Sequence, residues 1–293
     1  MKPTSLIFLV LSLILFFGGY VTTGLAKSMA ESSNIPIYEQ SFNDTGDAIY
    51  TYNISEETIS KLSLAFTGVD VTVVGMATES YFELKNFETT TYSTSLSAGV
   101  VSVDGDTSFL SSLIDMSDGG VSFRGLRYFL QDKPDPNRPK SVTVYISELS
   151  EIKSIAISLT QGSVTFKNIP NSFDYSINVT EGNVVLDNVD TTAVANISVA
   201  KGDVNISNSE ITALTVTQEE GATLLNGVND YAPEKTTYDL NAADTGTVRY
   251  NGVPVGYEYK ATAPAQQNRI KIASKNGTIT VLDSADQPIL PTP

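Results

Sequence analysis

The sequence predicts an all-β fold: a parallel β-solenoid of about 20-residue repeats, preceded by an N-terminal apolar helix. One unit recurs with its turn at Gly162, Gly182 and Gly202, and a weaker copy follows near Gly221. Apolar and polar residues alternate within each unit, which is the period of a half-buried strand. Hydrophobic residues make up 41% of the 293-residue chain and charged residues 17%, so a packed core is expected rather than disorder.

The apolar N-terminal segment, residues 1–28, is expected to be a membrane anchor or a signal peptide. Lys2 is followed by no charged residue until Lys27, and the 24 uncharged residues between them would form a helix of about 36 Å, long enough to cross a bilayer core. A signal peptide ends at a small-x-Ala site, which residues 24–26 provide. We therefore expect a single-pass cell-membrane protein with an extracytoplasmic C-terminal domain, or a protein secreted after signal cleavage.

Each repeat unit can be interpreted by position relative to its glycine. Apolar residues lie five and three positions before the glycine and two and four after it, as in Ile177, Val179, Val184 and Leu186. Alternation directs these side chains into the core, and Asp187 is then expected at the surface. Two turn positions recur, a glycine and, six residues later, an asparagine, because both tolerate left-handed backbone. The residues at these turns are Gly162, Gly182, Gly202, Asn168, Asn188 and Asn208.

Equal units with equivalent turns favour a solenoid, in which each coil stacks on the preceding one and like residues form ladders. A β-meander or sandwich is the alternative, since hairpins also show alternation. Looser copies of the unit occur at 96–103, 114–123, 246–250 and 272–281. The chain is thus divided into the N-terminal segment, a linker at 29–44, a β-repeat domain at 45–283 and a Pro-rich tail at 284–293.

Composition excludes several classes of function. The chain has no His and no Cys, which removes imidazole and thiolate chemistry and the metal sites built from them, so no cofactor or metal is expected. A net charge of −15 opposes nucleic-acid binding, which needs basic residues to neutralise phosphates. Paired carboxylates remain as acid–base candidates, and Asp104/Asp106 and Asp115/Asp118 lie beside glycines at expected turns.

The repeat unit, Leu/Ile-x-Val-x-x-Gly-x-Val-x-Ile/Leu-x-Asn-Val, resembles the β-strand-repeat "putative adhesin" family of bacterial cell-envelope proteins, a domain of unknown function. Residues 59–73 are similar to the first repeat of that family and residues 140–147 to its middle. The resemblance covers residues 45–283 and implies a β-repeat fold and an envelope location. It supplies no catalytic or binding residues.

A basic segment interrupts the repeats before residue 140. Bases interleaved with aromatic residues on a Pro-rich loop favour contact with an anionic cell-wall polymer or with lipid headgroups, and another envelope protein is the third candidate partner. The candidate ligand-binding residues are Arg124, Arg127, Lys133, Arg138 and Lys140. The sequence therefore predicts a non-enzymatic extracytoplasmic envelope protein of the interaction or adhesion type, tied to envelope-stress sensing. The alternative is a β-helix enzyme that processes polysaccharides with paired carboxylates.

Overall fold

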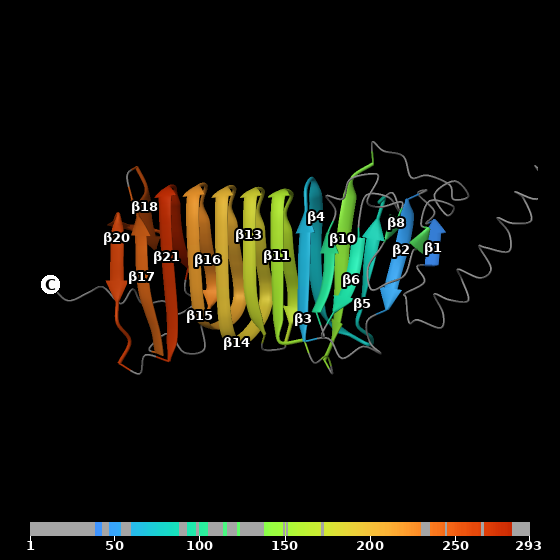
Figure 1. The fold of residues 1–293 in the computed structure, drawn as a ribbon. Coiled ribbons are helices and arrows are strands. Elements are labelled where there is room, and N and C mark those ends of the chain that lie inside the picture. Colours follow the sequence, from blue (N-terminus) through green and yellow to red (C-terminus); the bar gives the residue numbers. More distant parts are fainter. Residues whose placement is uncertain are drawn as a thin grey trace, which may run out of the picture.

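The computed structural model describes residues 39–42, 47–53, 60–87, 93–97, 100–104, 114–115, 122–123, 138–148, 150, 152–170, 173–229, 235–243, 245–264 and 267–282. In these ranges the chain forms two sheets that face each other along a rod, with parallel strands through its middle (Figure 1). The described residues contain no helix long and apolar enough to span a membrane. The N-terminal segment 1–28 and the tail 284–293 lie outside them.

The strands of the first sheet are, in spatial order, β1 (Glu39–Phe42), β2 (Ala48–Asn53), β5 (Tyr81–Lys85), β10 (Lys140–Ser147), β4 (Val69–Ala77), β12 (Val164–Ile169), the first parts of β14 (Val184–Lys201) and β15 (Val204–Glu220), β16 (Thr223–Val228), β22 (Thr278–Leu282), β18 (Thr247–Tyr250) and β19 (Val253–Gly256).

The strands of the second sheet are β6 (Ser93–Ser97), β7 (Val100–Asp104), β3 (Lys61–Phe66), β11 (Ser154–Gln161), β13 (Asp174–Glu181), the last parts of β14 and β15, β21 (Asn268–Asn276), β17 (Thr236–Ala242) and β20 (Glu258–Ala261). A separate pair consists of β8 (Ile114–Asp115) and β9 (Ser122–Phe123).

The repeats pair in parallel with the register that the sequence predicts. Ile157 lies opposite Ile177 in the second sheet, and Leu186 lies opposite Ile206 in the first. A meander would join neighbouring repeats by antiparallel pairs, so that alternative does not hold for them. The predicted all-β fold with parallel repeats is confirmed.

The turns bring neighbouring coils very close together. Gly162, Gly182 and Gly202 have φ values of 126°, 146° and 142°, and a Cβ added to Gly182 would lie 1.9 Å from the carbonyl oxygen of Gly162. The opposite corner is formed by asparagines with left-handed φ of 49° to 54°. There Asn188 Nδ2 donates a hydrogen bond of 2.9 Å to Asn168 Oδ1. A side chain at the glycine corner would separate the coils, whereas the asparagine corner accepts one.

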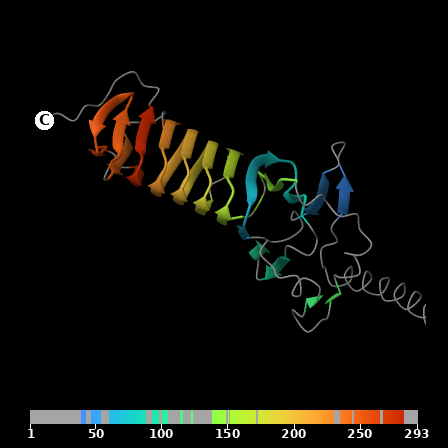
Figure 2. The same ribbon diagram turned by 90° about the horizontal axis from the view of Figure 1, so that it is seen from above.

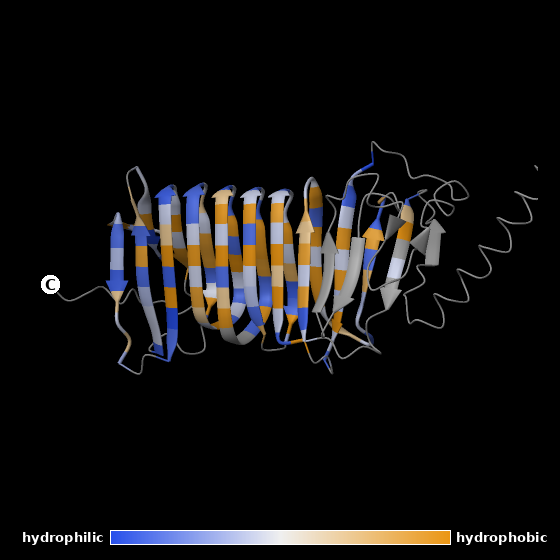
Figure 3. Ribbon diagram, in the orientation of Figure 1, coloured by the Kyte–Doolittle hydropathy of each residue, from blue (hydrophilic) through white to orange (hydrophobic). Residues whose placement is uncertain are grey.

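The core lies between the two sheets and follows the alternation of each strand (Figure 3). Val184 and Leu186 are fully buried, as predicted. Aromatic rings fill one region of the interior, where Tyr175 packs edge to face against Phe166 at 4.9 Å and Phe173 at 5.2 Å. Burial of these apolar faces is the main source of stability in a protein without disulfides.

The coils do not stack in the order of the chain. β21 pairs in parallel with β15 on one side and β17 on the other, and β22 lies in the same way between β16 and β18. The chain therefore forms the outer strands β17 and β18 first and pairs them with antiparallel β20 and β19. It then returns to insert its last coil, β21 and β22, between these outer strands and the strands β15 and β16 (Figure 2). The expectation that each coil stacks on the preceding one is wrong for the repeat copy at 272–281, which β21 and β22 form.

Two looser copies of the unit are hairpins rather than coils. β6 and β7 pair antiparallel, with Ser97 opposite Val100, because a two-residue connection closes a hairpin and is too short for a parallel crossover. The copy at 114–123 contributes only the antiparallel pair β8–β9. Within the predicted linker, residues 39–42 form β1, which pairs antiparallel with β2.

Candidate interaction surfaces

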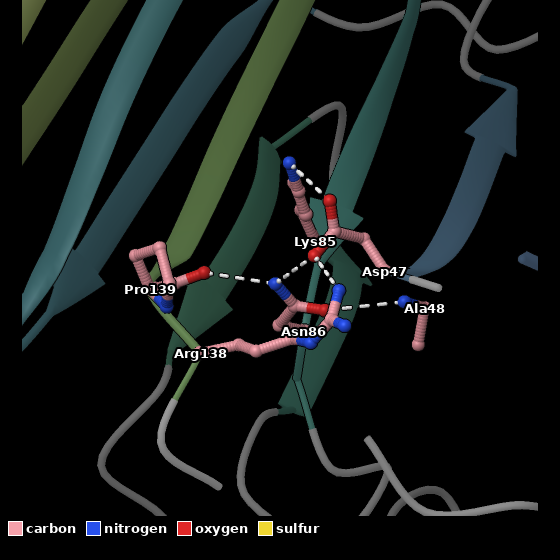
Figure 4. A network of polar contacts seen from close by, with 6 residues as sticks. All are labelled: Asp47, Ala48, Lys85, Asn86, Arg138 and Pro139. Carbon is pink, nitrogen blue, oxygen red and sulfur yellow. Dashed lines mark hydrogen bonds and ion pairs between the residues drawn. The ribbon is translucent and has the colours of Figure 1, made fainter. Parts of the chain in front are cut away.

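The segment that leads into β10 is held to β2 and β5 by charged side chains (Figure 4). Arg138 Nη1 donates a hydrogen bond to Asp47 Oδ1 at 2.7 Å, and Lys85 Nζ lies 2.7 Å from Asp47 Oδ2. The Asp47 side chain is 12% exposed, and those of Lys85 and Arg138 are 38% and 34% exposed. A carboxylate this shielded from water attracts its cations more strongly than a surface pair does. Arg138, a predicted ligand-binding residue, is thus oriented by contacts within the protein.

Asn86 completes this network at the end of β5. Its Nδ2 donates to Asp47 Oδ1 at 3.1 Å and to the Pro139 carbonyl oxygen at 3.0 Å, and its Oδ1 accepts from the backbone nitrogen of Ala48 at 3.1 Å. Asn86 is buried and has a φ of 59°, which asparagine tolerates better than most residues. One side chain thereby satisfies polar groups from segments far apart in the sequence.

Lys140 is the second predicted basic residue among the described ones. Its Nζ lies 5.9 Å from the centroid of the Phe87 ring, within the range of a cation–π contact. Phe87 in turn packs edge to face against Phe66 at 5.7 Å in the core. Arg138 and Lys140, at the start of β10, are thus each held by a separate contact within the protein, with Asp47 and with Phe87. The remaining three residues of the predicted set, Arg124, Arg127 and Lys133, lie outside the described residues.

Polar side chains next to the turn glycines form a ladder along one edge of the rod. Asp70 Oδ1 accepts from the backbone nitrogen of Ser163, Asn183 Oδ1 from that of Asp203, and Asp203 Oδ1 from that of Ala222, each at 2.8 Å. Each side chain thus satisfies a backbone donor of the next coil. The carboxylates in this ladder stabilise the stack.

The predicted carboxylate pairs are only partly described. Asp104 ends β7 and Asp115 ends β8, while Asp106 and Asp118 lie outside the described residues. Within the described ranges, no three acidic side chains gather in a group that could hold a metal ion. The acid–base role of these pairs stays a prediction.

The middle of the outer face of the second sheet is uncharged over four neighbouring strand segments, from β11 to β15, between Asp174 at one end of the strands and Glu219 at the other. Strand register aligns its outward side chains in two rows of small hydroxyl, amide and methyl groups. One row is Ala156, Ser176, Asn196 and Thr215, and the other is Ser158, Asn178, Ser198 and Thr217. On a chain with a net charge of −15, this face offers hydrogen-bonding groups without electrostatic repulsion.

An aromatic pair lies on the outer face of the first sheet. Tyr81 and Tyr145 are directly opposite in β5 and β10 and stack at 4.4 Å with an interplanar angle of 16°. Burial raises the pKa of Tyr145, and the negative charge of Glu83 raises it further. The first sheet therefore presents a stacked aromatic pair on its outer face, beside the charged side chain of Glu83.

The parallel repeats, the glycine and asparagine corners and the two flat faces define an all-β repeat protein. The chain belongs to the Toastrack DUF4097 family, whose model matches residues 59–246. This match confirms the resemblance found in the repeat unit.

Solved structures are similar to the chain at low sequence identity. A "putative cell adhesion protein" from Clostridium sporogenes ATCC 15579 is 16% identical, with 85% of this chain and 100% of that chain covered and a TM-score of 0.41. A "putative adhesin" from Bacteroides fragilis NCTC 9343 is 11% identical, with coverages of 80% and 97% and a TM-score of 0.42. No curated protein matches the chain.

Proposed function

We propose that the chain is a non-enzymatic interaction module of the adhesion type on the outer side of a bacterial cell membrane. The observation that carries this proposal is that inward and outward side chains of the repeats have different roles. Inward side chains build one continuous apolar core, and outward side chains form regular rows on two flat faces. Flat, repetitive faces suit contact along an extended partner.

The carboxylates of the repeats support a non-enzymatic role. Asp70 and Asp203 accept hydrogen bonds from the backbone of the next coil, and Asp187 accepts one from Ser207 Oγ at 2.8 Å. A general acid or base must instead reach a substrate proton with its carboxyl group. The alternative of a polysaccharide-processing enzyme therefore enters only as an outcome of the test below.

The proposal extends to location and partners. The N-terminal segment 1–28 holds the module at the membrane, with cleavage and secretion as the alternative, and the module contacts an anionic wall polymer, lipid headgroups or another envelope protein. Arg138 and Lys140 fix the end of the basic segment to the rod for this purpose. The proposal includes a role in envelope-stress sensing. Deletion of the protein should then alter the transcriptional response to cell-wall damage, and an unchanged response would contradict this role.

The location can be tested with a single introduced thiol, because the chain has no Cys. Ser198 is exposed on the neutral face of β14, and Ser198→Cys should react with a membrane-impermeant maleimide in intact cells. Ser5→Cys in the N-terminal segment serves as the control and should stay unlabelled. Labelling of Ser198→Cys only after cell lysis would contradict an outward orientation.

The function can be tested with the full-length protein in neutral detergent and isolated cell walls. Co-sedimentation should be saturable, and no reducing or unsaturated sugar should be released. Sugar release that a single Asp→Asn change abolishes would establish the enzyme instead. A variant with Gln at positions 124, 127 and 133 tests the basic segment while leaving the Asp47 network intact, and Arg138→Gln tests the network separately.

A further inference from the structure

β21 carries three basic side chains on the outer face of the second sheet. Arg269, Lys271 and Lys275 are exposed and alternate with Ile270 and Ile272, which are buried in the core. Among the described residues, none of the three cations forms an ion pair. We call this row of three cations the β21 stripe.

Few acidic groups face the β21 stripe. Asp239 lies opposite Lys271 on β17, and Glu219 lies level with Lys275 on β15, between the pairs Gln218/Ser274 and Glu220/Asn276. Three cations less these two carboxylates leave a charge of +1 on the strand face, and exposed Glu220, opposite Asn276 at the end of β21, is a third carboxylate nearby. The nearby cation Lys260 lies 2.5 Å from Glu258 and 3.9 Å from Asp239, so it adds no excess charge. The stripe is therefore a row of cations without ion-pair partners among the described residues, on a chain whose net charge is −15.

The spacing of the β21 stripe matches one kind of polyanion. Alternate residues of a strand are about 6.7 Å apart, so Arg269 and Lys271 are one such step apart and Lys271 and Lys275 are two. A step between alternate residues contains six backbone bonds, and an extended chain of six bonds spans about 7 Å. The phosphates of a poly(glycerol phosphate) chain also recur every six bonds. A polymer lying along β21 would thus place a phosphate at each cation.

The neighbouring strands match the rest of such a polymer. β15 presents Thr215 and Thr217 beside the stripe, and β17 presents Thr237 and Asn241 on the other side. These neutral groups can exchange hydrogen bonds with polyol hydroxyls without repelling the phosphates. We propose that the β21 stripe binds a linear polyol phosphate along the strand. The inference rests on the proposed function as an interaction module and places the polymer on the rod instead of on the basic segment.

The test uses the full-length protein in neutral detergent and fluorescently labelled poly(glycerol phosphate). Replacing Arg269, Lys271 and Lys275 together by Gln should weaken binding by about 3-fold to 100-fold, since three exposed ion pairs to phosphates are lost together. The slope of log Kd against log salt concentration should become shallower by about 2, because the variant loses three phosphate contacts and binding then releases fewer counterions. A charge-conserving variant, with Lys at position 269 and Arg at 271 and 275, should retain most of the affinity.

A control variant separates the site from net charge. Lys153, Lys167 and Arg249 are exposed and lie away from β21, so their joint replacement by Gln makes the same change in charge and should leave Kd within about twofold. Equal losses in the two triple variants would overturn the site. Binding of phosphatidylglycerol vesicles but not of the polymer, with the same loss in the stripe variant, would replace the polymer by a membrane surface and overturn the proposal.

The remaining outcomes distinguish this inference from the proposed function. If the stripe variant binds the polymer as well as the parent does, or if the parent binds walls but not the polymer, the stripe is not the site, and the interaction module stands. Loss of polymer binding in the variant with Gln at 124, 127 and 133, without loss in the stripe variant, would assign the contact to the basic segment. Sugar release from walls would remove the proposed function itself.

Discussion

Gly182→Ala is expected to disrupt the parallel stack, because its turn has no room for a side chain. Gly182 has a φ of 146°, and an added Cβ would lie 1.9 Å from the carbonyl oxygen of Gly162. Gly68 is a matched comparison, since its φ is 70° and no atom lies within 4 Å of an added Cβ. Both substitutions strain the backbone, but only the change at Gly182 forces two coils apart.

The expected cost at each glycine follows from these contacts. Left-handed backbone costs an alanine about 1–2 kcal/mol, and the φ of Gly182 lies further into the glycine region, where about 1–3 kcal/mol is typical. Relief of the clash also lengthens the hydrogen bonds from Gly162 N to Glu181 O, at 3.0 Å, and from Gly182 N to Lys201 O, at 2.9 Å. Each bond contributes about 0.5–1.5 kcal/mol, so the total at Gly182 is about 2–6 kcal/mol. A typical domain has only about 5–15 kcal/mol of stability.

Urea unfolding of the full-length protein, followed by far-UV circular dichroism, measures this difference. With a slope of about 1–3 kcal/mol per molar urea, the midpoint should fall by at least about 0.7 M for Gly182→Ala and by clearly less for Gly68→Ala. Equal shifts in the two variants would refute the reasoning, because backbone strain alone would then explain both. Loss of all strand signal in Gly182→Ala alone would support it.

Further predictions concern single side chains of the core and of the Asp47 network. Tyr175→Phe should raise stability by about 1 kcal/mol, since the buried hydroxyl has no hydrogen-bond partner among the described residues. Burial raises the pKa of Tyr175, so the parent should lose stability as the pH rises above about 10, and the Phe variant should lose less, in thermal melts across alkaline pH. Leu186→Ala should cost about 2–5 kcal/mol and Asp187→Ala about 0.5–1.5 kcal/mol; equal urea midpoints would contradict the register. Asp47→Ala should cost about 1–3 kcal/mol, a value lowered for the partial exposure of its cations, and an unchanged melting temperature would show that the network contributes nothing.

Features set by local pattern could be predicted from the sequence. Alternation assigns Val184 and Leu186 to the interior, and both are buried. The same alternation places Asp187 at the surface, and there the prediction holds only in part. Its carboxylate is partly covered and bonds to Ser207, because parallel neighbours one repeat apart lie only about 4.8 Å away. A pattern within one strand does not show such contacts between coils.

The order of the coils could not be predicted, since each coil offers nearly the same edges to any neighbour. Gln218 shows why the sequence misleads here. It takes the core position that Val199 holds in the preceding repeat, so a polar residue stands where the repeat pattern predicts an apolar one. In the structure Gln218 is buried, accepts a hydrogen bond of 2.8 Å from Thr223 Oγ1 and donates to the Gly202 carbonyl oxygen. This satisfied polar pair belongs to the layer on which the inserted β21 packs.

The Asp47 network was equally beyond the reach of sequence patterns. Its partners are 38 to 91 residues apart, and no periodicity connects them. Arg138 was assigned to ligand binding because basic residues gather around it, whereas its carboxylate partner lies before β2. Asn86 is the residue of the network whose left-handed backbone, with a φ of 59°, suits its residue type, since asparagine tolerates that conformation better than most residues.

The same separation of inward and outward positions explains how β21 can combine a structural role with a binding role. Ile270 and Ile272 face the core and close the stack, while Arg269 and Lys271 occupy outward positions that packing leaves free to vary. β21 is hydrogen-bonded on both sides, so the spacing of its side chains is fixed before any ligand arrives. A preformed row loses little backbone freedom on binding, so more of each ion pair's free energy remains as affinity. The proposed site is therefore a consequence of inserting this coil within the sheet and not at its edge.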